Sequence, residues 1–119
     1  MRIVITAQGN TLDSPLDPRF GRARSFIVCD TETGATHAVD VSANMNLAQG
    51  AGIQAAQMAA DAGAEAVITG HVGPKAFTAL NRGHIAVYLC DLATPREALA
   101  AFIEGKLRPA DTADREGHW

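Results

Sequence analysis

The sequence predicts an α/β fold, in which a three-layer domain has a five-stranded, mostly parallel mixed sheet flanked by helices. Short runs of β-branched and apolar residues predict strands, and segments with helix start and stop signals separate the later strands from one another. Strands that are linked through helices pair in parallel by right-handed crossovers. One strand of a predicted hairpin near the N-terminus is therefore expected to be the antiparallel member.

Five short runs predict the strands. They lie at residues 2–7, 25–30, 36–41, 66–69 and 85–89. The first run is rich in β-branched residues and is expected to be central, and the run at 66–69 is wholly apolar, as buried parallel strands are. The turn Thr31–Gly34 ends in glycine and joins the second and third runs as a hairpin.

Three segments carry helix signals. The first opens at Gly50, runs to about Ala62 and stops at Gly63, a residue suited to the left-handed position after a helix. The second spans Pro74–Arg82 and has proline at its first position. The third begins at the capping box Thr94–Glu97 and ends at the glycine at position 105.

Length and composition limit the domain organisation and the partners. A chain of 119 residues builds one domain, and we expect residues 1–107 to form it and residues 108–119 to form a loose polar tail. The net charge of −3 and the pI near 5.7 disfavour a nucleic-acid partner that depends on bulk positive charge. No apolar run approaches the roughly 18 residues of a membrane span, and we expect neither a membrane partner nor a signal peptide. With only two cysteines, the expected location is the cytoplasm.

Three glycine-rich loops are expected to meet at one edge of the sheet. They are Gln8–Arg24 after the first strand, Ser42–Gly52 before the first helix and Gly70–Lys75 after the fourth strand. Ligands of open α/β sheets bind beyond the carboxyl ends of the strands, and helix N-termini at such edges bind anions. The sequence therefore predicts an anion-binding cleft.

Basic residues gather in these loops. Arg19, Arg22 and Arg24 lie within six positions of one another, and Lys75 lies in the first turn of the second helix. A cation at a helix N-terminus is unfavourable for the helix itself, so a bound anion would account for it. The alternative is a solvated face on which Arg22 or Arg24 pairs with Asp13 or Asp17, since surface ion pairs are common.

One histidine and both cysteines are candidate metal ligands. His71 stands between two glycines at the mouth of the predicted cleft, where it could bind a soft metal or donate a hydrogen bond to an anion. The alternative is a loop histidine bonded to backbone carbonyl groups. Cys29 and Cys90 lie on apolar strands and are expected to be buried structural thiols.

The sequence lacks the motifs of the common enzyme classes. It has no GxGxxG after the first strand, no Walker A motif and no GxSxG. Two-metal hydrolysis needs clustered carboxylates, usually with one on the central first strand, and residues 2–7 contain none. We therefore expect a binding module and not an enzyme.

Three ordered segments carry a resemblance to a known family. They are Ser14–Ala23, Gly52–Ala56 and Gly70–Phe77, and the ending Ala98–Leu107 matches as well. Over residues 1–107 the chain resembles the dinitrogenase iron–molybdenum cofactor biosynthesis family, which includes the NifX and NifY carriers and the C-terminal part of NifB. The resemblance implies a ribonuclease H-like fold, which agrees with the fold predicted from the residues.

The resemblance also implies a function, the binding and carriage of a preformed metal–sulfur cluster by residues 1–107. One branch of the family, the orange proteins of sulfate-reducing bacteria, holds a molybdenum–copper sulfide cluster without covalent attachment. Such a cluster brings its own sulfides and a negative charge, so it needs cations, N–H donors and apolar walls. The predicted cluster-binding residues are Phe20, Gly21, Arg22, Arg24, Asn44, Met45, Gly50, Gly52, Ile53, Gly70, His71, Gly73, Pro74 and Lys75.

Two further points follow from the resemblance. Many family members carry histidine in the second loop, whereas Asn44–Leu47 has none, which leaves His71 as the better candidate for a metal ligand. The cargo is expected to be a molybdenum–copper sulfide cluster or a cluster of the iron–molybdenum cofactor type. The alternative function is a regulatory interaction module that acts through a P-loop ATPase of the same system.

Overall fold

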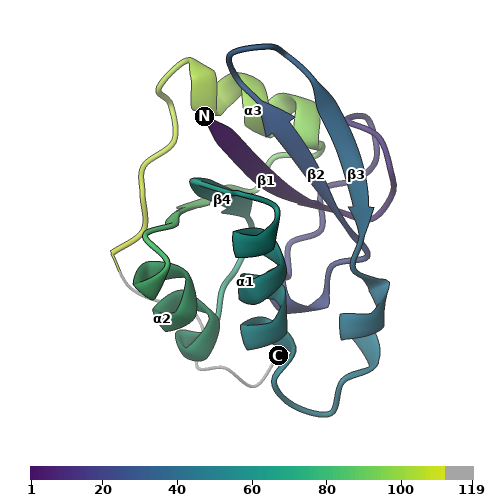
Figure 1. Ribbon diagram of the computed structural model, residues 1–119. Coiled ribbons are helices and arrows are strands. Elements are labelled where there is room, and N and C mark those ends of the chain that lie inside the picture. The colour runs from purple at the N-terminus through teal and green to yellow at the C-terminus, as the bar shows by residue number, and fades with distance from the viewer. Residues whose placement is uncertain (112–119) are drawn as a thin grey trace.

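A five-stranded sheet forms the middle layer of the computed structural model, which describes residues 1–111 (Figure 1). The strands lie in the order β3-β2-β1-β4-β5. Their bounds are β1 Arg2–Ala7, β2 Ser25–Asp30, β3 Thr36–Asp40, β4 Ala66–Thr69 and β5 Ala86–Leu89. The pairs β1–β4 and β4–β5 are parallel, and the pairs β1–β2 and β2–β3 are antiparallel. Only β2 therefore runs against the other strands of this sheet, as predicted for the hairpin.

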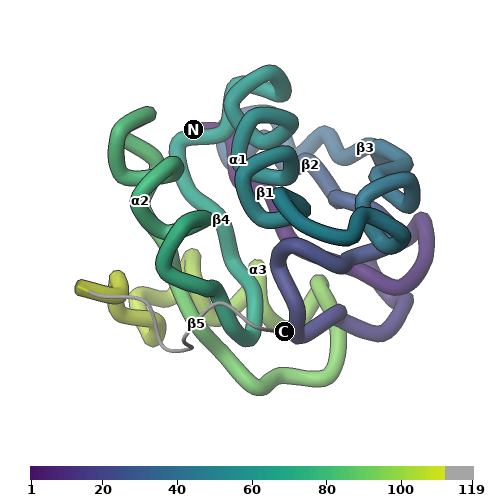
Figure 2. The backbone as a smooth tube through the Cα atoms, turned by 90° about the horizontal axis from the view of Figure 1, so that it is seen from below, coloured from purple at the N-terminus to yellow at the C-terminus, as the bar shows by residue number. Residues whose placement is uncertain are grey.

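Helices form the two outer layers. They are α1 Ala51–Asp61, α2 Pro74–Arg82 and α3 Pro95–Ile103. Seen from below in Figure 2, the sheet lies between α1 and α2 on one side and α3 on the other. The predicted three-layer α/β architecture is therefore confirmed.

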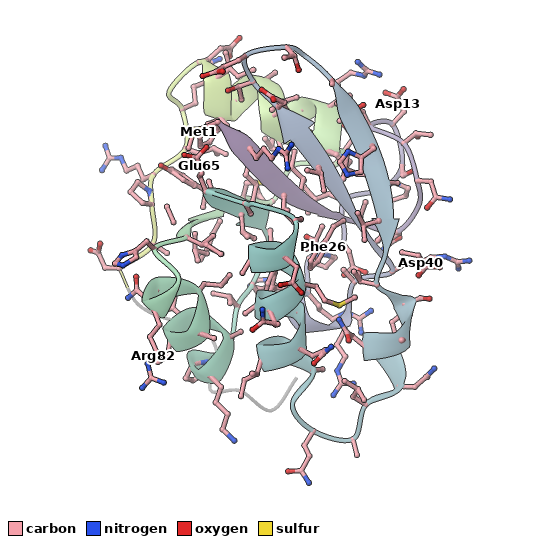
Figure 3. The ribbon with its side chains drawn as sticks, viewed as in Figure 1. Met1, Asp13, Phe26, Asp40, Glu65 and Arg82 are labelled. Atoms are coloured by element: carbon pink, nitrogen blue, oxygen red, sulfur yellow. The ribbon has the colours of Figure 1, made fainter. Side chains whose placement is uncertain are left out.

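The two faces of the sheet have separate cores, because successive side chains of a strand point to opposite faces. Val4 of β1 and Phe26 of β2 pack with the alanines of α1, and Figure 3 shows Phe26 between β2 and α1. Ile3 and Ile5 of β1 pack with Ala98 of α3 on the other face. Apart from Arg2 at its start, β1 is buried on both faces, as expected for a central strand.

The element boundaries agree closely with the predicted ones. The third strand ends at Asp40 and the fifth begins at Ala86, each one residue inside the predicted run. Two loops that were expected to be irregular contain short 3-10 helices, η1 Phe20–Arg22 and η2 Ser42–Asn46. Proline and glycine exclude longer helices from such segments but allow a single tight turn.

The segment after α3 returns to the sheet. Pro109 forms an antiparallel bridge with Tyr88, and the Ala110 N–H donates to the Val87 carbonyl at 2.7 Å. Pro109 and Ala110, which lie in the segment expected to be a loose tail, therefore dock on β5, and residues 112–119 lie outside the described residues. No helix within residues 1–111 is long and apolar enough to cross a membrane.

Candidate functional site

A pocket of about 680 Å³ opens where the loops after β1 and β4 meet the starts of α1 and α2. This volume lies within the range of small-molecule sites. We call it the basic pocket, because its lining within residues 1–111 includes three cations and no acidic side chain. It is lined by Arg19, Phe20, Gly21, Arg22, Met45, Ala48, Gln49, Gly50, Ala51, Gly52, Ile53, His71, Gly73, Pro74, Lys75 and Ala76.

The starts of two helices face this pocket without side-chain caps. The N-cap residues of α1 and α2 are Gly50 and Gly73, and neither makes a side-chain cap hydrogen bond. The N-cap of α3, in contrast, is Thr94, whose hydroxyl accepts from the Glu97 N–H at 3.2 Å. First-turn N–H groups and the helix dipole attract negative charge. The two helix starts are therefore suited to an anion in the basic pocket.

Small residues allow these segments to approach closely. A Cβ atom added at Gly52 would lie 3.0 Å from the Ala76 Cβ, so α1 and α2 are in contact at their starts. A Cβ atom added at Gly21 would lie 3.0 Å from the Gly52 Cα, which places η1 directly against α1. Any larger side chain at either glycine would push the walls of the basic pocket apart.

Lys75 and Arg19 bring positive charge to the pocket from two different loops. Lys75 is exposed in the first turn of α2, and none of the ion pairs within residues 1–111 involves it. Arg19 lies beside the loop that follows β4, because it forms a parallel β-bridge with His71. Its Nε atom is 3.6 Å from the buried Asp17 carboxylate. These two cations therefore flank the helix starts.

Arg22 lines the pocket, but its guanidinium is engaged by the chain itself. The Nη1 group donates to the carbonyl oxygens of Leu47, Met45 and Asn44, at 2.6, 3.2 and 3.4 Å. This arginine therefore ties η1 to η2.

Three of the predicted residues do not line the basic pocket. Arg24 is exposed near Asp40, which Figure 3 shows at the end of β3, far from α2 in that view. Asn44 is buried, and its Nδ2 group lies 3.3 Å from the Met58 sulfur. Gly70 instead permits a close approach of the first loop, since an added Cβ atom would lie 2.7 Å from the Pro18 Cα.

The alternative ion pairs that the sequence suggested are also wrong. Asp13 forms a two-point pair with Arg96 of α3, at 2.8 and 3.0 Å. This arginine lowers the pKa of the Asp13 carboxyl below its ordinary value. Asp17 accepts from the Arg19 N–H at 2.9 Å, so neither aspartate pairs with Arg22 or Arg24 in the described part of the chain.

His71 stands at the boundary of two cavities. It lines the basic pocket and also a second cavity of about 600 Å³, whose lining includes Cys90. Its carbonyl oxygen accepts from the Phe20 N–H at 3.2 Å, which joins the first loop to the loop after β4. Within residues 1–111 no cluster of three or more His, Cys, Asp or Glu side chains is placed to hold a metal ion.

Neither cysteine has the environment of a thiolate ligand. Cys29 is buried under α3, and burial raises the pKa of its thiol to about 11. Cys90 is half-buried, and burial raises its pKa as well. Thiolate ligands need a lowered pKa. Cys29 is therefore the buried thiol that the sequence suggested, whereas Cys90 is only partly buried.

An apolar rim borders one side of the basic pocket. Ile53 of α1 is 49% exposed and Met45 of η2 is 41% exposed, although both are large apolar side chains. Phe20 forms part of the floor and is 1% exposed, because its ring stacks on Phe26 with centroids 5.8 Å apart. Five lining residues were absent from the predicted set, and all of them except Ala48 adjoin a predicted residue in the chain: Arg19, Ala48, Gln49, Ala51 and Ala76.

Comparisons with known proteins identify relatives of this chain. The sequence profile of the family described as dinitrogenase iron-molybdenum cofactor matches residues 1–105. An uncharacterised protein of Methanocaldococcus jannaschii, MJ0580, is 30% identical over 109 residues, which are 90% of this chain and 89% of that protein.

Two solved structures are similar over nearly their whole length. The apo form of the orange protein from Desulfovibrio gigas is 44% identical, with a TM-score of 0.93 over 96% of each chain. A NifB-type protein from Thermotoga is 36% identical, with a TM-score of 0.85 over 98% of each chain. The chain therefore belongs to the dinitrogenase iron–molybdenum cofactor family.

Proposed function

We propose that the basic pocket binds and carries a preformed, anionic metal–sulfide cluster that contains molybdenum. The observation that carries this proposal is the convergence of two uncapped helix starts with Lys75 and Arg19 around one pocket. Fixed N–H donors and cations at a partly enclosed site bind anions strongly. The role is that of a carrier, and no catalytic group is assigned.

The donor set of the pocket suits a cluster that brings its own sulfide ligands. Such a cargo needs no protein thiolate, and the raised pKa values of Cys29 and Cys90 keep both thiols protonated at neutral pH. The rim formed by Met45 and Ile53 would cover the sulfide face of the cargo and limit its contact with water. His71 is the lining residue that could bind a soft metal directly.

The cluster that we favour is a molybdenum–copper sulfide, and the alternative cargo is of the iron–molybdenum cofactor type. The similarity to the orange protein from Desulfovibrio gigas supports the first composition. The family described as dinitrogenase iron-molybdenum cofactor supports the second. Both are anionic metal–sulfur assemblies, so the same pocket chemistry serves either.

The proposal can be tested by loading the metal-free protein under anaerobic conditions with tetrathiomolybdate and copper. After desalting, the visible spectrum is recorded and molybdenum, copper and iron are quantified. We expect retained molybdenum and copper with a new charge-transfer band. Lys75→Ala should lower the retained molybdenum about tenfold, whereas Lys106→Ala should not, because Lys106 pairs with Glu104 outside the pocket.

Other outcomes separate the alternatives. Retention of an iron–molybdenum cofactor-type cluster alone would change the assigned composition. If the wild-type protein retained neither cargo, the carrier function would be wrong. Recovery of a P-loop ATPase from a pull-down with the metal-free protein would then favour the regulatory function.

A further inference from the structure

We propose that Arg22 is a positioning residue, which fastens residues 44–47 as a wall of the basic pocket and does not contact the cargo. The inference rests on the proposed function, since the wall matters only if the pocket is filled. It reassigns a side chain that the sequence predicted to face the anion directly. The evidence is the hydrogen bonding of one guanidinium nitrogen.

The guanidinium reaches across from η1 to η2. Its Nη1 group lies within hydrogen-bond distance of three carbonyl oxygens, all within residues 44–47, and the shortest contact, to Leu47, is 2.6 Å. These carbonyl groups belong to the last residues of η2 and to the residue that follows it. A hydrogen bond from a charged donor to a carbonyl oxygen is stronger than one from a neutral donor. The three contacts therefore hold the end of η2 at a fixed place beside η1.

The segment itself has little else to hold it. Met45 and Leu47 are exposed by 41% and 38%, so apolar burial contributes little to their placement. Asn44 is the buried member, anchored through its Nδ2 contact with Met58 of α1. Within residues 1–111, the side-chain hydrogen bonds that attach this wall to other elements come from Arg22 and Asn44, and those of Arg22 reach its outer part.

The position of Met45 depends on this attachment. Met45 lines the basic pocket next to Gln49 and Ile53, while its carbonyl oxygen accepts from Arg22. If the guanidinium were lost, the wall could move away and the cargo would leave sooner. The rate of cargo entry depends on the charge at the mouth, which Lys75 and Arg19 supply.

The test uses Arg22→Lys, which keeps the charge but replaces the planar fork by a compact, strongly hydrated ammonium group. Arg24→Ala is the matched control, because it removes an arginine two positions away that lies outside the pocket. Hydrogen exchange of the amides at residues 44–47 is measured in the metal-free protein. Association and dissociation rates of tetrathiomolybdate are measured by stopped-flow absorbance, and the melting temperature is recorded for each variant.

We expect Arg22→Lys to speed amide exchange at residues 44–47 and to raise the tetrathiomolybdate dissociation rate about tenfold, which corresponds to about 1.4 kcal/mol. The association rate should stay within about twofold of wild type, since the charge is kept. Lys75→Ala should instead lower the association rate. Arg24→Ala should change neither amide exchange nor dissociation.

Two results would overturn the proposal. If Arg22→Lys had the same amide exchange rates and the same tetrathiomolybdate dissociation rate as the wild-type protein, only the charge of Arg22 would matter. Faster exchange with an unchanged dissociation rate would show that residues 44–47 are not a wall for the cargo. If the wild-type protein failed to retain tetrathiomolybdate while Arg22→Lys still sped exchange, the proposed function would fail and the fastening by Arg22 would stand as a structural feature.

Discussion

Single residues of the same charge have different tasks at this site. Lys75 and Arg19 supply positive charge at the pocket, Arg22 holds carbonyl oxygens, and Arg24 lies near Asp40 outside it. The difference comes from the backbone that surrounds each side chain and not from its chemistry. The net charge of the chain is −3, so the local arrangement of these few cations decides where an anion can bind.

Cys29 gives a prediction at this scale. Its thiol has a pKa of about 11 in the folded chain and of about 9 when unperturbed. The folded state therefore holds this proton more tightly, and its contribution to stability is complete below pH 9 and is lost as the pH rises towards 11. We expect denaturation curves to show the wild-type protein losing about 2 kcal/mol more than Cys29→Ala over this interval. Equal losses in the two proteins would contradict the assignment.

The three helices divide into two kinds. α1 and α2 have glycine N-caps, which provide no side-chain cap, and they face the basic pocket, whereas α3 is capped by the Thr94 side chain and lies on the other face of the sheet. A cap satisfies the N–H groups that an anion would otherwise contact. The two helices without side-chain caps are thus the ones whose starts line the proposed binding pocket, and α3 packs on the other face of the sheet.

This division predicts different results for two destabilising changes. In Gly52→Val, the new side chain should collide with Ala76 and push α1 away from α2. We expect this change to destabilise the protein by about 1–3 kcal/mol and to lower the retention of tetrathiomolybdate. Thr94→Ala should cost about 1 kcal/mol through the lost cap and leave retention unchanged. Urea denaturation and molybdenum analysis after desalting check both. Loss of retention in Thr94→Ala would show that retention follows stability and not pocket shape.

At the scale of the whole molecule, the pocket joins separate segments between residues 19 and 76. Its walls come from the loop after β1, from η2, from both helix starts and from the loop after β4. A ligand that contacts all of these holds them together and is bound only by the folded state. Binding is therefore coupled to global unfolding.

Tetrathiomolybdate should accordingly raise the melting temperature of the wild-type protein. At a free concentration one hundred times the dissociation constant, the gain is about 2.7 kcal/mol, enough to shift the midpoint by several degrees. Differential scanning calorimetry measures the shift. Lys75→Ala should show a smaller shift in melting temperature at the same concentration of tetrathiomolybdate. An equal shift in this variant would mean that the ligand binds outside the basic pocket.

The fold was predictable because its signals are local. The apolar runs that predict the strands lie within those strands. Pro74 and the Thr94–Glu97 capping box likewise lie at the starts of the helices that they predict. The convergence of three loops was also predictable, since it follows from parallel strands linked by helices.

Side-chain partners within those loops were not predictable. Arg24 comes to lie near Asp40 because Ser25 pairs with Asp40 in the hairpin, and neither residue reveals that register. The partners of Arg22 are backbone carbonyl oxygens more than twenty residues away, which carry no side-chain signal. Asn44 is buried although its chain neighbours, Ala43 and Met45, are exposed, because its amide lies against the Met58 sulfur.

The return of Pro109 and Ala110 to β5 has a consequence for association between copies of the chain. An exposed strand edge invites pairing with another chain, and proline blunts such an edge because it has no N–H to donate. With Pro109 opposite Tyr88, the β5 side of the sheet is closed to a further strand at that point. The opposite edge is β3, whose residues are mostly exposed. Growth of the sheet by strand addition is therefore directed to β3.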